Sequence, residues 1–262
     1  MINICIFSRD RSCQLDLFLS SMKEFFLEYK NYKINVLYTY SNKEFEKGYN
    51  KLKEYHTDIN FILEKSFKSD VINIIDENNK YTIFFVDDII WKNKFTLDSI
   101  EFKKFESDLH ILCLSLRLHP NLTYCYTANL PMIKPKTYKD GMWYWKMEPA
   151  DDYSYPMSMD AHFFRTEEIL PLLKTLDYRN PNSLESVLSF NPLQKAKMSC
   201  FEESIIVNNP CNKVQTNNPN KHGDITSTDL NKEFLKGKRL DFEIYRGIKN
   251  ISCHQELPIK FI

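Results

Sequence analysis

Two adjacent carboxylates, Asp87 and Asp88, follow an apolar run in the segment YTIFFVDDIIW. Like charges at this spacing repel each other, and burying them costs free energy unless a counter-ion lies close by. A divalent cation such as Mg²⁺ or Mn²⁺ supplies that counter-ion and also bridges to the phosphates of a bound diphosphate. The pair therefore indicates a metal site, and the alternative interpretation is a hydrated strand end without a ligand.

Glycine is scarce, which restricts how the chain could hold a phosphate. A Rossmann or P-loop site needs clustered glycines so that the backbone can approach the phosphates closely. The five glycines are instead scattered, at positions 48, 141, 223, 237 and 247. If the protein binds a nucleotide, we expect a metal on carboxylates to hold the phosphates.

The segments around the acidic pair predict an α/β fold with a mainly parallel central sheet. Apolar, β-rich runs occur at 2–8, 33–41, 59–65 and 81–88. Helical periodicity occurs between them, at 15–29, 42–56 and 67–78. Strands that alternate with helices predict βαβ units, and ligands in such sheets bind at the carboxyl ends of the strands. Ser8, Arg9, Asp10 and the acidic pair all lie at such ends.

The second half of the chain is less regular. The patterns predict a helix or a helix and then a strand over 105–118, an aromatic loop-rich stretch over 120–156, a strand entering a helix over 161–176, a helix over 180–190, a strand over 199–210, and a polar and then helical stretch over 218–241. We interpret residues 1–262 as a single domain. Its nucleotide-binding half covers 1–90, and its acceptor-side half covers 105–262.

The bulk composition argues against several classes of protein. Lys plus Arg equals Asp plus Glu, at 35 each, which gives no reason to expect a nucleic-acid partner. Seven cysteines without CxxC spacing indicate reduced thiols and a cytoplasmic location. The sequence has neither about 18 consecutive apolar residues nor a basic leader, so we expect no transmembrane segment and no signal peptide. Any membrane contact would be peripheral.

The βαβ beginning, the FFVDD strand end and the missing glycine-rich loop together resemble the GT-A-fold nucleotide-sugar glycosyltransferases of the family 2 type. The opening FSRDRSCQLDLFLSSM is similar to the first strand and helix of bacterial and viral members. The acidic motif of these enzymes, DxD or a variant such as xDD, carries Mn²⁺ or Mg²⁺. The resemblance implies Asp88 as a metal ligand and Asp87 beside the nucleotide. It also implies a UDP-, GDP- or dTDP-sugar donor and a glycan or lipid-linked acceptor.

The resemblance extends to two segments on the acceptor side. In SMDAHFFRTEEI (158–169), Asp160 and Ala161 stand where relatives often carry a small or Gly-Gly pair. In NPNSLESVL (180–188), Glu185 stands where inverting members carry a Glu-Asp pair, and it is implied as the base that takes the proton of the acceptor hydroxyl. Asp160 and then Asp152 are the reserve candidates. The alternatives are a turn residue for Asp160 and a solvated glutamate for Glu185.

A histidine near the end of the sequence is a further candidate ligand. Many GT-A enzymes use a C-terminal histidine on the metal, and His254 in ISCHQELPIKFI is suitably placed. Its alternative is an ordinary surface histidine. His222, in the polar segment NKHGD, is a weaker candidate for a loop that closes over the donor.

Arginines and aromatic residues supply the remaining candidates. Arg9 could pair with a diphosphate or stack on a base, and Asp10 could bond a base or ribose. Arg117 is a second candidate for phosphate or sugar contact, with a structural salt bridge as its alternative. A group of aromatic residues could stack on the apolar faces of a sugar, with simple core packing as the alternative. The group consists of Trp143, Tyr144, Trp145, Tyr153 and Tyr155.

Two other functional classes remain as alternatives to a glycosyltransferase. A nucleotidyltransferase that makes nucleotide sugars would normally show a glycine-rich loop after the first strand. A non-catalytic glycan-binding protein would more often be all-β. Within the glycosyltransferase class, Glu185 as the base implies inversion at the anomeric carbon, and retention stays open.

Overall fold

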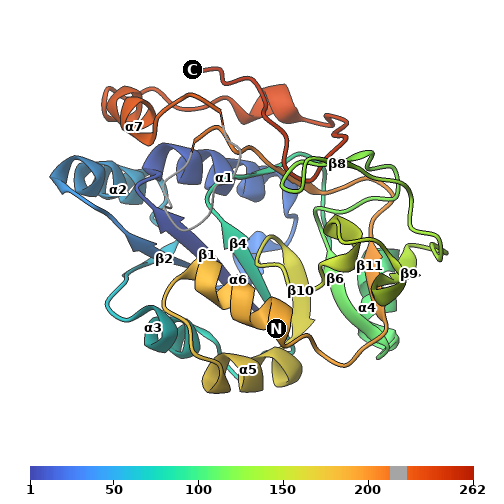
Figure 1. Ribbon diagram of the computed structural model, residues 1–262. Helices are drawn as coiled ribbons and strands as arrows, with labels where there is room; N and C mark the ends of the chain where they lie inside the picture. The colour runs from blue at the N-terminus through green and yellow to red at the C-terminus, as the bar shows by residue number, and fades with distance from the viewer. Residues whose placement is uncertain (213–222) are drawn as a thin grey trace.

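An eight-stranded sheet forms the centre of the computed structural model, which describes residues 1–212 and 223–262 (Figure 1). The predicted loop residue His222 lies outside the described residues. The strand order is β3-β2-β1-β4-β10-β6-β11-β9. In chain order these strands are β1 (Ile2–Arg9), β2 (Ile34–Thr39), β3 (Asn60–Leu63), β4 (Tyr81–Val86), β6 (Ile111–Ser115), β9 (Met142–Tyr144), β10 (His162–Arg165) and β11 (Lys197–Cys200).

Most neighbouring strands of this sheet run in the same direction. Strand β1 pairs in parallel with β2 and β4, β2 with β3, and β6 with β11. Strand β10 runs antiparallel between β4 and β6, and β9 runs antiparallel to β11. The predicted α/β class with a mainly parallel sheet is confirmed. The sheet includes strands from both predicted halves, 1–90 and 105–262.

Helices cover both faces of the sheet and give the molecule three layers (Figure 1). The helices are α1 (Ser12–Phe25), α2 (Lys43–Tyr55), α3 (Phe67–Ile74), α4 (Ile100–Ser107), α5 (Thr166–Thr175), α6 (Pro181–Phe190) and α7 (Ser227–Leu235). Because side chains alternate along a strand, Ile4 and Ile6 face one layer while Cys5 and Phe7 face the other. The first layer contains α1, α2, α4 and α7, and the second contains α3, α5 and α6.

Two small sheets complete the fold. Strand β5 (Ile89–Trp91), which follows the acidic pair, is antiparallel to β12 (Ile206–Asn208), and β7 (Tyr124–Cys125) is antiparallel to β8 (Leu130–Pro131). The single strand predicted over 199–210 is therefore wrong. The chain leaves the main sheet after β11, passes the exposed Glu202 and Glu203, and enters the small sheet at β12. Apolar residues on both sides of this turn are buried, but against different partners.

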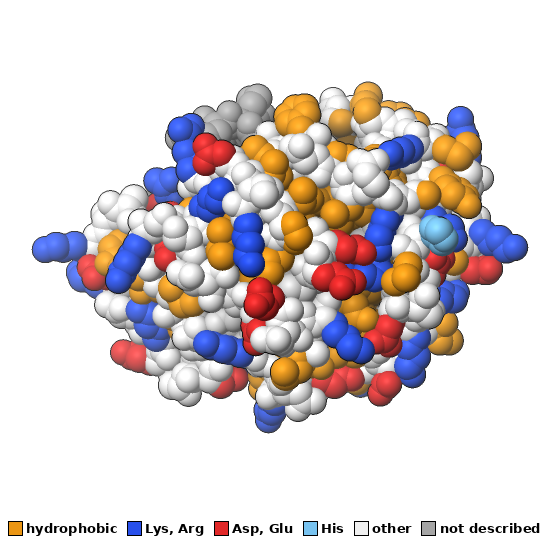
Figure 2. Space-filling model, turned by 90° about the horizontal axis from the view of Figure 1, so that it is seen from below, with side chains coloured by type: hydrophobic (Ala, Val, Ile, Leu, Met, Phe, Trp, Pro, Cys, Tyr) orange, Lys and Arg blue, Asp and Glu red, His pale blue; other side chains and the backbone are white. Residues whose placement is uncertain are grey.

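All seven cysteines lie in the described part of the chain, and each is a buried free thiol. Among the described residues, no helix is both long and apolar enough to cross a bilayer. Figure 2 shows the face that lies below in Figure 1, where Lys and Arg side chains alternate with Asp and Glu. This face has no extended tract of one charge, in keeping with the balanced composition.

Candidate functional site

The acidic pair lies at the point where the strand order of the sheet changes direction. From β1 the chain moves outward to β2 and β3, and then returns to β4 on the other side of β1. The carboxyl ends of β1 and β4 therefore lie side by side, with Phe7 opposite Val86. Open α/β sheets bind ligands outside the carboxyl ends of their strands at such a switch point.

Asp87 is buried and ties the loop after β1 to the end of β4. Its Oδ2 accepts hydrogen bonds from the Ser8 hydroxyl (2.8 Å) and from the Arg9 backbone N–H (3.1 Å). Its Oδ1 accepts from Arg11 Nη1 at 3.0 Å. Burial raises the pKa of Asp87, and the charge of Arg11 offsets this effect only in part. Arg11 thus compensates the buried charge of Asp87 only in part.

Asp88 is more accessible than Asp87 and is fixed mainly by β12. Its Oδ1 accepts from Asn208 Nδ2 at 3.0 Å, and its backbone oxygen accepts from Asn209 N–H at 2.8 Å. Arg11 Nη1 lies 3.3 Å from its Oδ2. These contacts hold the Asp88 carboxylate at the carboxyl edge of the sheet, where the sequence analysis predicted it.

The residues of the β1 loop that are predicted to bind the nucleotide differ in how accessible their side chains are. The Ser8 hydroxyl is buried between Asp87 and the Tyr49 hydroxyl, which lies 2.7 Å away. Asp10 is buried, has a positive φ of 56°, and accepts from the Ser41 backbone N–H at 2.7 Å. The Arg9 side chain is 58% exposed, so its guanidinium is the group of this loop that a ligand can reach.

His254 lies in a segment that pairs with β12 at Asn208, the residue whose side chain bonds Asp88. Asn208 donates its backbone N–H to Cys253 and accepts from Gln255 N–H, each at 2.9 Å, so it bridges the His254 segment and the acidic pair. His254 Nε2 lies 3.3 Å from Asp160 Oδ2. Its Nδ1 is buried and has no hydrogen-bond partner among the described residues. A carboxylate on one ring nitrogen and a free lone pair on the other is the usual arrangement of a metal-ligating histidine.

These features fit a divalent cation that takes only some of its ligands from the protein. Nowhere in the described part of the chain do three His, Cys, Asp or Glu side chains form a ready-made metal cluster. Mg²⁺ and Mn²⁺ at phosphate-transfer sites commonly use one or two carboxylates and take the remaining ligands from substrate phosphates and water. Asp88 and His254 could supply that small protein share.

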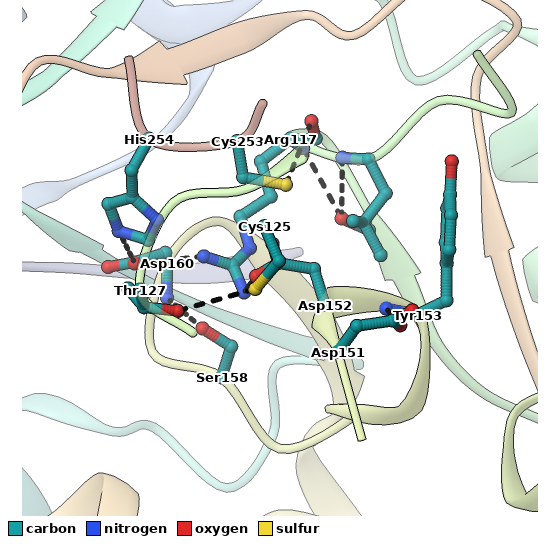
Figure 3. Close-up of polar contacts among 12 residues, drawn as sticks. Arg117, Cys125, Thr127, Asp151, Asp152, Tyr153, Ser158, Asp160, Cys253 and His254 are labelled. Carbon is teal, nitrogen blue, oxygen red and sulfur yellow. Dashed lines mark hydrogen bonds and ion pairs between the residues drawn. The ribbon is translucent and has the colours of Figure 1, made fainter. Parts of the chain in front are cut away.

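Arg117 organises the part of the same edge that follows β6 and precedes β10 (Figure 3). It follows the carboxyl end of β6 and is buried, with Nη1 3.2 Å from Asp160 Oδ2 and Nη2 3.3 Å from Asp152 Oδ1. Figure 3 shows the guanidinium between these two carboxylates and His254 on the far side of Asp160. The two pairs use the charge of Arg117 internally, which favours a positioning role over direct contact with a phosphate.

Glu185 reaches this group from the second turn of α6, one turn later than the sequence predicted. Its Oε1 accepts from the Ser158 hydroxyl (2.9 Å) and the Met159 backbone N–H (3.0 Å), immediately before Asp160. Burial and the charge of Asp160 raise the pKa of Glu185. Burial also acts on Asp160, but the hydrogen bond from His254 and the charge of Arg117 outweigh it and lower its pKa. Two carboxylates beside one turn thus differ in basicity.

Because β10 runs antiparallel to β4 and β6, the turn that precedes it lies at their carboxyl ends. Asp160 and Glu185 therefore share an edge of the sheet with Asp88 and His254. Of the aromatic candidates, Trp143 and Tyr153 are buried in the core, and Trp143 Nε1 donates to the Tyr153 backbone oxygen at 2.8 Å.

The sequence analysis assigned no role to Arg11 or Asn208, the two residues that hold the acidic pair. Arg11 stands in the same SRDR segment as Arg9, and its position at the start of a helix was the available signal. Asn208 begins an Asn-Asn-Pro sequence directly after an apolar run, which is typical of a strand end.

The chain is similar in sequence to the bifunctional glycosyltransferase pgtA of Dictyostelium discoideum, with 29% identity over 187 residues. The match covers 64% of this chain and 24% of that protein, so the chain spans about a quarter of the length of the curated relative. No protein-family model matches the chain.

Solved structures of similar shape include residues 1–349 of TarS from S. aureus, with a TM-score of 0.47, 11% identity, and coverage of 78% of this chain and 59% of that one. A cytidylyltransferase from Leptospira borgpetersenii gives a TM-score of 0.44 at 12% identity and covers 95% and 98% of the two chains. The resemblance to glycosyltransferases predicted from the sequence is confirmed by the curated relative.

Proposed function

We propose that the chain transfers a sugar from a nucleotide-sugar donor to a hydroxyl group of a glycan or lipid-linked acceptor, with Mn²⁺ or Mg²⁺ as cofactor. The observation that carries this proposal is the placement of Asp88, His254 and Glu185 along one edge of the sheet, beside its switch point. The sequence similarity to a glycosyltransferase supports it independently.

In this proposal the β1 loop and the acidic pair receive the donor. Asp88 and His254 hold the cation, which would offset the negative charge of the leaving diphosphate when bound. Arg9, exposed at the end of β1, reaches the nucleotide. Asp87 acts through its bonds to Ser8 and the Arg9 backbone, because it keeps this loop against the end of β4.

Glu185 is the proposed base of the transfer step. Its oxygen accepts the proton of the acceptor hydroxyl while the hydroxyl oxygen attacks the anomeric carbon, and the bond from that carbon to the diphosphate breaks on the opposite face, so that the nucleoside diphosphate leaves. The attack inverts the configuration at that carbon. The raised pKa of Glu185 supports this role over Asp160, whose lowered pKa makes it the weaker base.

A thermal-shift screen tests donor and metal together. UDP-, GDP-, dTDP- and CMP-sugars are added with Mn²⁺ or with EDTA, and a specific donor raises the apparent melting temperature by mass action only when Mn²⁺ is present. Asp88→Asn keeps the shape of the side chain but removes its charge, so this response should disappear. An equal shift with EDTA, or a full shift in the variant, would contradict the metal site.

The matched control is Asp98→Asn, because the Asp98 side chain is 87% exposed and lies outside the site. This variant should respond to donor and Mn²⁺ as the wild type does. For the active donor, NMR of the product formed with simple acceptor glycosides reports the configuration at the anomeric carbon. A retained configuration would remove Glu185 from the role of base.

A further inference from the structure

We propose that Arg11 is the resident counter-ion of the acidic pair and that a divalent cation must displace it in order to bind. The proposal rests on the metal-dependent function proposed above and deepens it. Its starting point is a single nitrogen, Arg11 Nη1, which lies 3.0 Å from Asp87 Oδ1 and 3.3 Å from Asp88 Oδ2. A divalent cation held by Asp88 would compete with this nitrogen for the Asp88 carboxylate.

The remaining nitrogens of the guanidinium fix Arg11 in this position. Nε donates to the Asn212 side-chain oxygen at 2.8 Å, and Nη2 donates to the Asn212 backbone oxygen at 2.6 Å. The Arg11 side chain is only 11% exposed. Arg11 thus joins the acidic pair to the chain beyond β12, and it is bonded on both sides.

Electrostatic repulsion prevents Arg11 and a metal ion from occupying the site at the acidic pair at the same time. Although burial opposes the charged form, the charges of Asp87 and Asp88 raise the pKa of Arg11, so the guanidinium stays protonated. Two cations cannot share the space between the same carboxylates without strong repulsion at low dielectric. A metal ion held by Asp88 therefore has to displace the guanidinium from the pair. Displacement also breaks the bonds to Asn212.

Arg9 provides the contrast within the same loop. Its side chain is 58% exposed, and its ion pair with Asp10 is a long contact of 3.7 Å from Nε to Oδ2. It carries the same charge as Arg11 at nearly the same place in the sequence. Effects that come from general positive charge near the site should appear at both positions, and effects of displacement only at Arg11.

The test is a titration of the whole protein with Mn²⁺ alone, with free Mn²⁺ measured by its EPR signal at room temperature. Arg11→Gln should bind Mn²⁺ at least tenfold more tightly than the wild type, whereas Arg9→Gln should bind it within about twofold. Arg11→Lys keeps the charge but cannot bond both carboxylates and Asn212, so its affinity should lie between these values. Circular dichroism confirms that each variant is folded.

A second measurement asks whether a guanidinium and Mn²⁺ compete for one place. In Arg11→Ala, millimolar guanidinium chloride should weaken Mn²⁺ binding severalfold, while an equal concentration of sodium chloride should not. The wild type, whose place is filled, should show no difference between the two salts.

Equal Mn²⁺ affinity in the wild type and Arg11→Gln, or weaker binding in the variant, overturns the displacement proposal and leaves the proposed function standing. Lack of Mn²⁺ binding by the wild type and every variant, both alone and with the donor found in the screen, overturns both, because the metal site itself is then absent. A guanidinium effect of the same size in Arg11→Ala and the wild type also overturns displacement.

Discussion

Glu185 accepts hydrogen bonds from Ser158 and Met159, directly before Asp160, so the two carboxylates lie beside the same turn. Their electrostatic surroundings nevertheless differ. Asp160 pairs with the Arg117 guanidinium and bonds the His254 ring, whereas Glu185 is bonded by a hydroxyl and a backbone N–H. Environments that push two carboxyl groups in opposite directions are a common way of separating acid and base roles. At the scale of single residues, this asymmetry is the strongest guide to the chemistry of the site.

Glu185→Gln tests the assignment of the base. The amide keeps the shape of the side chain and removes its basicity, so turnover should fall by roughly 10²–10⁴-fold while donor affinity stays nearly unchanged. The measurements are steady-state transfer with the donor found in the screen and donor binding by thermal shift. Asp160→Asn is the comparison. Wild-type turnover in Glu185→Gln together with an inactive Asp160→Asn would move the role of base to Asp160.

Lys92 gives a residue-scale prediction away from the site. The side chain is 1% exposed, and its Nζ has no hydrogen-bond partner within the described chain. Burial lowers its pKa to about 8. At pH 7 the folded protein keeps this ammonium group charged in a buried site without a hydrogen-bond partner among the described residues. Lys92→Met removes the cost of burying that charge, so it should raise the free energy of unfolding by about 1–3 kcal/mol.

The sign of the pH dependence follows from the same shift. Between pH 8 and about 10.4 the unfolded chain keeps the Lys92 proton that the folded protein has lost, so this residue makes stability rise with pH across that window. The advantage of Lys92→Met should therefore be largest below pH 8 and shrink toward pH 10. Urea unfolding of both proteins at pH 7, 8, 9 and 10 measures it. A constant difference would contradict the buried charge.

At the scale of elements, Ala161 shows how the turn before β10 is built. This buried residue has φ of 57°, in the left-handed region that favours glycine, and its backbone bonds both neighbouring strands. The N–H donates to the Phe84 backbone oxygen at 2.9 Å, and the oxygen accepts from Leu116 N–H at 3.0 Å. The strain places Asp160 at the edge of the sheet. The Gly-Gly pair implied by the resemblance would relieve this strain.

Ala161→Gly should therefore leave stability within about 1 kcal/mol of the wild type or raise it, because relief of the positive φ offsets the extra entropy of unfolded glycine. Ala161→Val, with a branched side chain at the same φ, should lower stability by more than about 1 kcal/mol. Chemical unfolding of the three proteins gives both values. Similar losses in the two variants would show that volume, not backbone conformation, governs this position.

The elements of the first half could be predicted from the sequence because each depends on local periodicity. All four predicted strands and three predicted helices between residues 2 and 88 are present, with ends that differ by a few residues. The acidic pair could be placed for the same reason, since it follows such a strand. Contacts between distant segments left no local signal. Arg11 bonds Asn212 from 201 positions away, and neither residue shows a pattern that identifies its partner.

At the scale of the whole molecule, the continuous sheet predicts that the two halves unfold together. Strand β4 from the first half pairs with β10 from the second, and β5 pairs with β12. Separation of the halves would expose the edge of β4 and break both sheets. We expect one cooperative transition in urea.

The three tryptophans make this prediction measurable, because Trp91 lies in β5, next to the first half, and Trp143 and Trp145 lie in the second. Fluorescence of Trp143→Phe/Trp145→Phe reports the region of β5, and that of Trp91→Phe reports the region of β9. Both midpoints should coincide with that of far-UV circular dichroism. Two separated midpoints would show that the halves are independent folding units.

The seven buried thiols can report on opening of the structure, because each reacts with an alkylating reagent only when it becomes exposed. Burial raises the pKa of every one, so the native protein offers almost no thiolate to an alkylating reagent. Each event that opens the structure exposes reactive sulfur from β1, α1, β6, β7 or β11, and the reagent adds a fixed mass. Intact-protein mass spectra during iodoacetamide treatment would then distinguish concerted opening, in which several thiols react at once, from stepwise local fraying. A protein without engineered labels can thus record which parts of its structure open together.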